Sequence, residues 1–176
     1  LHDVNLSNDS ITKIIKGEIN TEVNIAVKRK GLDSLLNFSI TRNRIPIKSV
    51  NAGIALNDEL GYIKINRFAE TTYPEFIEKL QKLKQHGISK LILDLRDNGG
   101  GFLKEAIAIA DEFLPDETPI LFTKNRSGKT KENFATRKST FLNGELYVLI
   151  NENSASASEI VAGALQDNDR GYIVGR

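Results

Sequence analysis

The sequence contains no cysteine and only two histidines, and each scarcity removes a class of chemistry. Without cysteine the chain forms no disulfide bond, uses no thiolate nucleophile and builds no cysteine-ligated zinc site. His2 and His86 stand far apart, and neither has a companion at the spacing typical of metal ligands. The two histidines also give no support for a Ser-His-Asp triad. Any hydrolytic chemistry is therefore expected to use other side chains, with no metal.

Long apolar runs and a strong charge of one sign are also missing. No run of about eighteen apolar residues and no signal-peptide pattern occurs. The net charge is +1, so neither a nucleic acid nor an anionic membrane is indicated as a partner. Hydrophobic residues make up 40% of the chain and charged residues 27%, which is typical of a globular protein with a substantial core.

A stretch of small residues, NSASASE at 153–159, marks the boundary between a predicted strand and a predicted helix. Residues 145–151 form a short apolar run with strand character, and residues 159–167 carry apolar side chains at helical spacing. At such a boundary the backbone N–H groups are unpaired and the helix dipole favours negative charge. A serine there can reach a substrate while neighbouring amides hold an oxyanion. The structural alternative is an ordinary helix cap.

A second stretch, DNGGG at 97–101, also joins a predicted strand to a predicted helix. The strand is the apolar run before Asp97, and the helix covers about residues 101–113. Successive glycines let the backbone approach a ligand closely and point its amides outward. A plain tight turn is the alternative. A nucleotide loop is disfavoured because neither G-x-G-x-x-G nor G-x-x-x-x-G-K-[ST] is present.

Four ordered motifs together resemble the carboxyl-terminal processing (tail-specific) serine peptidases. They are GYIKINRF at 61–68, LDLRDNGGG at 93–101, SASASEI at 154–160 and ALQDNDR at 164–170. The resemblance covers nearly the whole chain. It implies an α/β fold with a Clp protease/crotonase-like core, a peptidase activity and no cofactor.

The same resemblance assigns roles to individual residues. It implies that Ser156 is the nucleophile and that the amides of Ala157 and Gly100 form the oxyanion hole. Asp167 matches an aspartate that the family needs for activity, and Glu159 matches a glutamate close behind the nucleophile. We expect both to orient or hold structure rather than carry protons, with an arginine (Arg96 or Arg170) or loop amides as the partners of Asp167. The general base of the family is a lysine roughly twenty-five residues beyond the serine, kept neutral by burial. The chain ends at Arg176, before that position.

Alternating strand and helix patterns predict the architecture of residues 45–176. Strands are expected at 47–50, 61–68, 90–95, 119–123 and 145–151, with helices between them. Such alternation favours a mainly parallel sheet with flanking helices. We interpret this segment as a serine peptidase core lacking its C-terminal portion. The polar and basic segment 124–138 is expected to be a solvated hairpin rather than a binding patch.

Residues 1–44 are expected to form a separate unit. A capped helix at 7–17 precedes two alternating strands at 22–29 and 36–42, with turn residues between them. This order resembles the second half of a PDZ domain, and residues 43–46 are interpreted as the link into the core. The carboxylate-binding loop of a PDZ domain would belong to the first half.

The sequence favours two classes of function and leaves a third as a less favoured alternative. The first is a serine endopeptidase that cuts proteins near their carboxyl termini, binds substrates through those tails and works in the cell envelope or periplasm. The second is a non-catalytic peptide-binding scaffold or an inactive fragment. The third is a crotonase-like acyl-thioester enzyme, which uses a similar pair of amides without needing the Ser156 context.

Overall fold

The computed structural model describes residues 7–43 and 48–176. The chain divides into two compact units, Leu1–Ile47 and Lys48–Arg176, which are described separately. The predicted link at 43–46 lies mostly outside the described residues.

The first unit consists of one helix and one antiparallel hairpin. Its elements are α1 (Asn8–Ile15), β1 (Glu22–Val27) and β2 (Leu36–Thr41). Ser7 caps α1 by accepting a hydrogen bond from the backbone N–H of Ser10, so the predicted cap, helix and two strands are confirmed. None of the described residues in this unit is fully buried, but Val23 and Ile25 are half-buried at alternate positions of β1, as the alternating pattern predicts. The assignment to half of a PDZ domain stays a prediction.

The second unit is built on a five-stranded mixed sheet. Its strands, in spatial order, are β3 (Val50–Ala55), β4 (Leu60–Ile65), β5 (Lys90–Asp94), β8 (Glu145–Ile150) and β9 (Tyr172–Gly175). Neighbours from β4 to β9 pair in parallel, and β3 pairs antiparallel with β4. The mainly parallel sheet is therefore as predicted. The strand predicted at 47–50 begins outside the described residues, and of residues 48–50 only Val50 belongs to a strand, β3. Strand β9 was not predicted.

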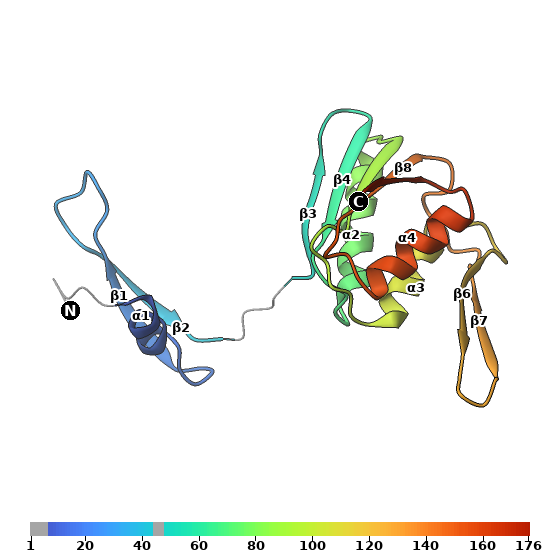
Figure 1. The fold of residues 1–176 in the computed structure, drawn as a ribbon. Helices are drawn as coiled ribbons and strands as arrows, with labels where there is room; N and C mark the ends of the chain where they lie inside the picture. The colour runs from blue at the N-terminus through green and yellow to red at the C-terminus, as the bar shows by residue number, and fades with distance from the viewer. Residues whose placement is uncertain (1–6, 44–47) are drawn as a thin grey trace. The chain divides into compact units, whose positions relative to one another are not determined.

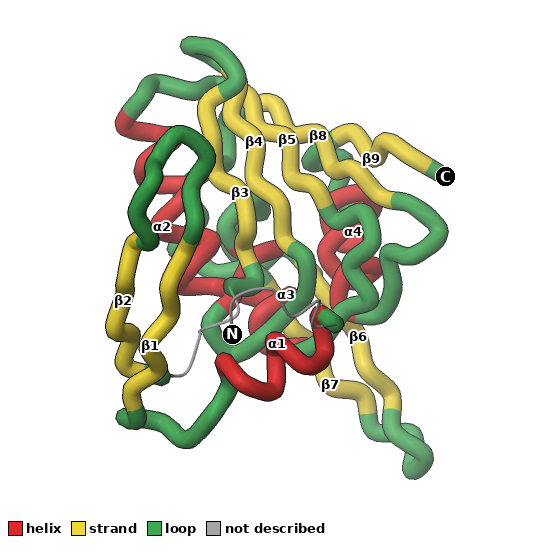
Figure 2. The backbone as a smooth tube through the Cα atoms, turned by 90° about the vertical axis from the view of Figure 1, so that its left-hand side faces the viewer, coloured by secondary structure: helices red, strands yellow, loops and turns green. Residues whose placement is uncertain are grey.

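Three helices cover one side of this sheet, as Figures 1 and 2 show. They are α2 (Thr72–Gln85), α3 (Leu103–Asp111) and α4 (Ala157–Asp167). The strands bury every second residue against them, for example Ile63 and Ile65 on β4 and Leu91 and Leu93 on β5. This alternation fixes which strand residues face the core and which face the opposite side.

A second hairpin, β6 (Pro119–Lys124) and β7 (Thr130–Phe134), projects from the body of this unit in Figure 1. The strand predicted at 119–123 is therefore β6 of this hairpin and not part of the mainly parallel sheet. The hairpin covers most of the segment predicted to be a solvated hairpin, and its residues from Phe122 onward are largely exposed. Across the described residues, no helix combines the length and the apolar character needed to cross a membrane.

Arg170 ties together the chain segments that follow α3 and α4. Its guanidinium donates to the backbone carbonyl oxygens of Phe113, Phe141 and Gly144 at 2.5–3.0 Å. The planar fork of arginine suits several acceptors at once, and the side chain is half-buried. These carbonyls would lose their partner if the guanidinium were removed.

Arg170→Ala is therefore expected to lower the free energy of unfolding by on the order of 2–4 kcal/mol, because it leaves three carbonyl oxygens unpaired. Arg137→Ala is the matched control, since Arg137 is 91% exposed and pairs only with Asp116 among the described residues. That control should cost about 0–1 kcal/mol. Urea denaturation measures both variants, and equal losses would contradict the account.

Candidate active site

Two strand-to-helix turns meet at one edge of the sheet. The glycine loop (residues 97–101) follows β5, and the serine loop (residues 151–156) follows β8, the parallel neighbour of β5. Because parallel strands end at the same edge, both loops and the helix N-termini after them lie together. A methyl group placed on Gly100 would lie 2.8 Å from Ser156 Cβ, which shows how closely the loops approach. Ser156 therefore lies beside Gly100, at the edge of the sheet where both strands end.

Asn98 is the buried residue that joins the two loops. Its side-chain Nδ2 donates to the carbonyl of Ile65 at the end of β4, and its Oδ1 accepts from the N–H of Gly100, both at 2.9 Å. Its own carbonyl accepts from the N–H of Ala155 and from the hydroxyl of Ser158. Asn98 is fully buried, so these bonds satisfy polar groups that water cannot reach. One residue thereby sets the spacing of three chain segments.

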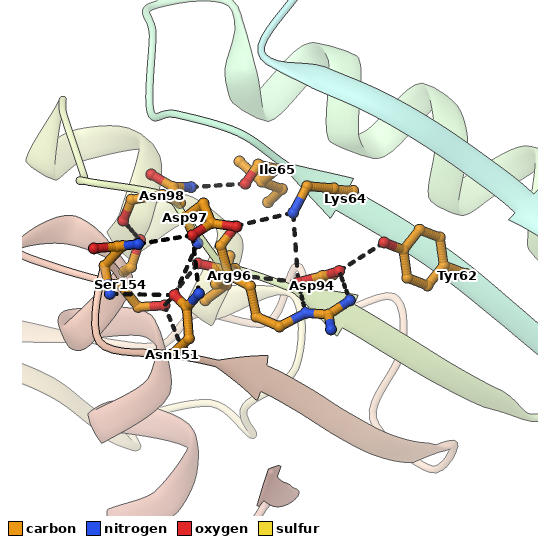
Figure 3. A network of polar contacts seen from close by, with 12 residues as sticks. Tyr62, Lys64, Ile65, Asp94, Arg96, Asp97, Asn98, Asn151 and Ser154 are labelled. Carbon is orange, nitrogen blue, oxygen red and sulfur yellow. Dashed lines mark hydrogen bonds and ion pairs between the residues drawn. The ribbon is translucent and has the colours of Figure 1, made fainter. Parts of the chain in front are cut away.

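A second set of polar contacts reinforces this junction at the surface (Figure 3). Asp97 accepts hydrogen bonds from the side-chain amides of Asn151 and Asn153, each at 2.9 Å, and its N–H donates to Asn151 Oδ1. The bonds from Asn153 and Asn151 hold the pKa of Asp97 below its usual value. The carboxylate therefore stays charged and keeps the two loops clamped at neutral pH.

The backbone of Ser156 adopts a conformation that serine rarely takes. Its φ is 54° and its ψ is −111°, at the N-cap of α4. A non-glycine residue in such a region costs on the order of 1–3 kcal/mol, and such residues cluster at functional sites. A sharp strand-to-helix turn of this kind exposes the serine hydroxyl at the top of a sheet.

Hydrogen bonds distinguish Ser156 from the two serines beside it. The hydroxyl of Ser154 donates to the carbonyl of Leu95, and that of Ser158 donates to the carbonyl of Asn98, each at 2.8 Å. Ser158 is fully buried, whereas Ser156 is exposed and lines a groove. Of the three serines, Ser156 is the one placed to meet a substrate.

The residues next to Ser156 supply backbone donors and one carboxylate. Ala157 is the first residue of α4, where N–H groups lack helical acceptors. Glu159 accepts a hydrogen bond from the N–H of Ser156 at 2.5 Å, as in a capping box at the start of α4. An orienting role of Glu159 in catalysis stays a prediction. The N–H of Gly100, the predicted second oxyanion donor, is bonded to Asn98 Oδ1 in this structure. Its role in an oxyanion hole stays a prediction.

Asp167 lies at the opposite end of α4 from Ser156. An arginine, with Arg96 and Arg170 as candidates, or loop amides were expected as its partners, and this expectation is wrong. Arg96 is bound to Asp94, and Arg170 is turned toward three backbone carbonyls. Within the described part of the chain, the Asp167 carboxylate has no hydrogen-bond or ion-pair partner.

An unpredicted ionic cluster lies on the sheet face away from the helices, beneath the glycine loop (Figure 3). Asp94 is fully buried and accepts two bonds from the Arg96 guanidinium and one from the Tyr62 hydroxyl, at 2.6–3.0 Å. Lys64 lies 3.6 Å from the same carboxylate. Burial alone would raise the pKa of Asp94, but the hydrogen bonds from Arg96 and Tyr62 outweigh it and lower the pKa to about 2.

A groove runs along α4 from Ser156 to the far end of the helix. Its volume is about 670 Å³, and its walls are α4 and strand β6. The lining residues are Pro119, Ile120, Leu121, Phe122, Ser156, Glu159, Ile160, Gly163, Ala164, Asp167 and Asn168. Ser156, the candidate nucleophile, therefore lies in the wall of a long, mostly apolar groove with room for an extended peptide.

Comparison with known proteins identifies the class to which this fold and site belong. Residues 59–176 match the model of "Peptidase family S41". That match covers both loops and all of α4, so the chain belongs to peptidase family S41.

Individual relatives agree with this assignment. The chain is 38% identical over 173 residues to "Carboxyl-terminal-processing protease" of Synechocystis, covering 97% of this chain and 40% of that protein. It is 33% identical over 170 residues to "Probable CtpA-like serine protease" of Staphylococcus aureus, covering 95% and 33%. The solved structure of a photosystem II D1 C-terminal processing protease superposes with a TM-score of 0.65 at 27% identity, covering 89% and 44%. The chain thus spans less than half the length of these relatives.

An alanine series through the glycine loop tests the packing of the site. Gly101 has a φ of 143°, and a methyl group there would lie 2.0 Å from the carbonyl oxygen of Phe68. Gly101→Ala is therefore expected to cost at least about 2 kcal/mol of folding free energy. A methyl group on Gly99 meets nothing within 4 Å, so Gly99→Ala should stay within about 1 kcal/mol. Thermal or urea unfolding of both variants measures the contrast, and similar losses would show that the loop is not held as described.

Titration of Asp94 gives a pH-dependent prediction. Its pKa is about 2 in the folded protein and about 3.9 in an unfolded chain, so the carboxylate stabilises the fold above pH 4. This stabilisation is lost as the pH falls from about 4 toward 2. The native chain should exceed Asp94→Asn in free energy of unfolding, measured by urea denaturation. This difference should shrink as the pH falls from about 4 toward 2. A constant difference from pH 7 to pH 2 would contradict the assignment.

Proposed function

We propose that the whole protein is a serine endopeptidase that cleaves proteins near their carboxyl termini, with Ser156 as nucleophile. The observation that carries this proposal is the strained backbone of Ser156, which sits where β8 turns into α4 and faces a peptide-sized groove. Membership of family S41 and the names of the relatives support the same reaction.

The proposed reaction begins with attack of Ser156 Oγ on the scissile carbonyl carbon. A neutral lysine accepts the hydroxyl proton and later gives it to the departing amine, and water then hydrolyses the acyl-enzyme ester. By the family resemblance this lysine lies about twenty-five residues after Ser156, outside residues 1–176. Glu159 would hold the N–H of Ser156 in place, because its carboxylate already accepts that bond.

The developing oxyanion would be held by the N–H groups of Ala157 and Gly100. Both lie beside Ser156, since a methyl group on Gly100 would come within 2.9 Å of the Ala157 nitrogen. Gly100 now donates to Asn98, so that hydrogen bond would have to open or be shared when substrate binds. Losing one donor of this kind costs about 10²–10³ in rate, which makes the loop geometry as important as the side chains.

The remaining assignments follow the family rather than a contact in the structure. Residues 1–44 would be the second half of a PDZ domain. Since the carboxylate-binding loop belongs to the first half, these residues alone should not capture a peptide tail. The cell envelope or periplasm is the proposed location.

Cleavage assays on a short and an extended chain test this function. The chain of residues 1–176 should fold without cleaving an unstructured protein that has an apolar carboxyl tail, because a serine hydroxyl is a weak nucleophile without a base. A chain extended through the proposed lysine should cleave it. Ser156→Ala in the extended chain should abolish cleavage, while Ser127→Ala, on the exposed hairpin, should leave it intact.

Two results would overturn parts of this proposal. Cleavage by the short chain that disappears in Ser156→Ala would mean that a base lies within residues 1–176. An extended chain that binds the substrate without cutting it would favour a peptide-binding scaffold.

A further inference from the structure

The surface contacts of Asp97 form a clamp that the proposed reaction does not use (Figure 3). Asp97 lies in the glycine loop, and its two partners, Asn151 and Asn153, lie in the serine loop. Asp97 Oδ1 accepts a hydrogen bond from Nδ2 of each asparagine at 2.9 Å. The N–H of Asp97 donates to Asn151 Oδ1, also at 2.9 Å. Three hydrogen bonds therefore join the loops, and we call these three residues the outer clamp.

The outer clamp and the buried Asn98 hold different parts of the serine loop. The clamp reaches Asn151 and Asn153, where the loop begins. Asn98 reaches the N–H of Ala155 and the hydroxyl of Ser158, on either side of the candidate nucleophile. A loop that is held at one end only can pivot about that end, whereas a loop held at both ends keeps its position. The clamp therefore supplies the second attachment of the serine loop.

The outer clamp also holds the glycine loop. Asp97 has a φ of 61°, in the left-handed region that aspartate adopts more readily than most residues other than glycine. Such a conformation persists where the surrounding structure stabilises it. Both the N–H and the carboxylate of Asp97 are bonded to Asn151, so the clamp favours this turn. The turn sets the direction in which the glycines leave β5.

The spacing of the two loops matters because each carries one of the proposed oxyanion donors. Gly100 lies three residues after Asp97, and Ala157 lies four residues after Asn153. Both N–H groups must come within about 2.7–3.1 Å of the oxyanion to stabilise it. A misplacement of about 1 Å can cost on the order of 100-fold in rate. None of the three clamp residues lines the groove along α4, so the clamp is not needed to bind the substrate there.

We propose that Asp97 is a positioning residue, whose bonds to Asn151 and Asn153 set the spacing of the oxyanion donors Gly100 and Ala157. This inference rests on the proposed peptidase function and adds a residue on which the rate depends without contact to the substrate. Asp97 acts as a hydrogen-bond acceptor and not through its charge. Asp97→Asn keeps an Oδ1 with two lone pairs, which can accept both bonds, whereas Asp97→Ala removes both.

The test measures kcat and KM of these two variants in the extended chain, on one unstructured peptide substrate. Asp97→Ala should lower kcat by about 10-fold and leave KM within about twofold, because only the transition state uses the oxyanion donors. Asp97→Asn should keep kcat within about threefold of the native value, because its side chain still bridges the loops. Equal losses of kcat in the two variants would show that the charge is what matters and would overturn the proposal.

Asn153→Ala tests the same contact from the serine loop. It removes one of the two bonds to Asp97 and leaves the glycine loop unchanged, so kcat should fall by about threefold. The double variant with Asp97→Ala should be no slower than Asp97→Ala alone, because both changes break the same bond. Asp116→Ala is the matched control, since it removes an exposed aspartate whose partner, Arg137, lies in neither loop, and it should keep the native kcat. Thermal unfolding checks that each variant is folded at the assay temperature.

A peptide boronic acid separates failure of this inference from failure of the proposed function. Its tetrahedral adduct with the Ser156 hydroxyl places an oxygen at the oxyanion position, so its Ki should rise in Asp97→Ala by the factor that kcat falls. A native extended chain that neither cleaves nor binds the boronic acid would overturn the peptidase function, and Asp97 would then have no reaction to support. An active native chain with an equally active Asp97→Ala, or a lower kcat with an unchanged Ki, would overturn this inference alone.

Discussion

The site depends on a buried amide that joins three segments distant in the sequence. Asn98 bonds to Ile65 at the end of β4, to Gly100 in its own loop and, through its carbonyl, to Ala155 and Ser158. Leaving one of these buried polar groups without a partner costs about 1–3 kcal/mol of folding free energy. The bonds therefore favour the same arrangement of the three segments. Few other arrangements of these loops would satisfy the same groups.

This junction explains how the chain holds Ser156 in an unfavourable conformation. Serine keeps a positive φ only where contacts with the surrounding structure outweigh its own preference for a negative φ. Asn98 fixes the residues on both sides of Ser156, and the close approach of Gly100 leaves no space for a side chain between the loops. The serine is thereby presented to the groove before any substrate arrives, which is the preorganisation that a nucleophile requires.

Much of this arrangement could be predicted from the sequence because the signals were local. Apolar periodicity located α2, α3 and α4, and the two turns of small residues located the site at the ends of adjacent parallel strands. Strand β3 was misplaced because its residues include Asn51, Ala52 and Gly53, which have low strand propensity, and its pairing with β4 holds it in the sheet.

The long-range polar partners could not be predicted in this way. Asp94 and Tyr62 are separated by 32 positions, and the strand register of β4 against β5 brings them together. The same limit explains the error at Asp167, for which an arginine or loop amides were expected as partners. The arginines had closer acceptors, Asp94 for Arg96 and three carbonyls for Arg170, and α4 carries Asp167 along a groove instead.

Covalent labelling tests most directly whether the fold makes Ser156, and not its neighbours, the reactive serine. A peptidyl fluorophosphonate is incubated with the extended chain, and the modified residue is mapped by mass spectrometry. The account predicts a single adduct on Ser156, because Ser154 and Ser158 donate their hydroxyl protons to Leu95 and Asn98. Adducts on Ser154 or Ser158, or labelling that persists in Ser156→Ala, would contradict it.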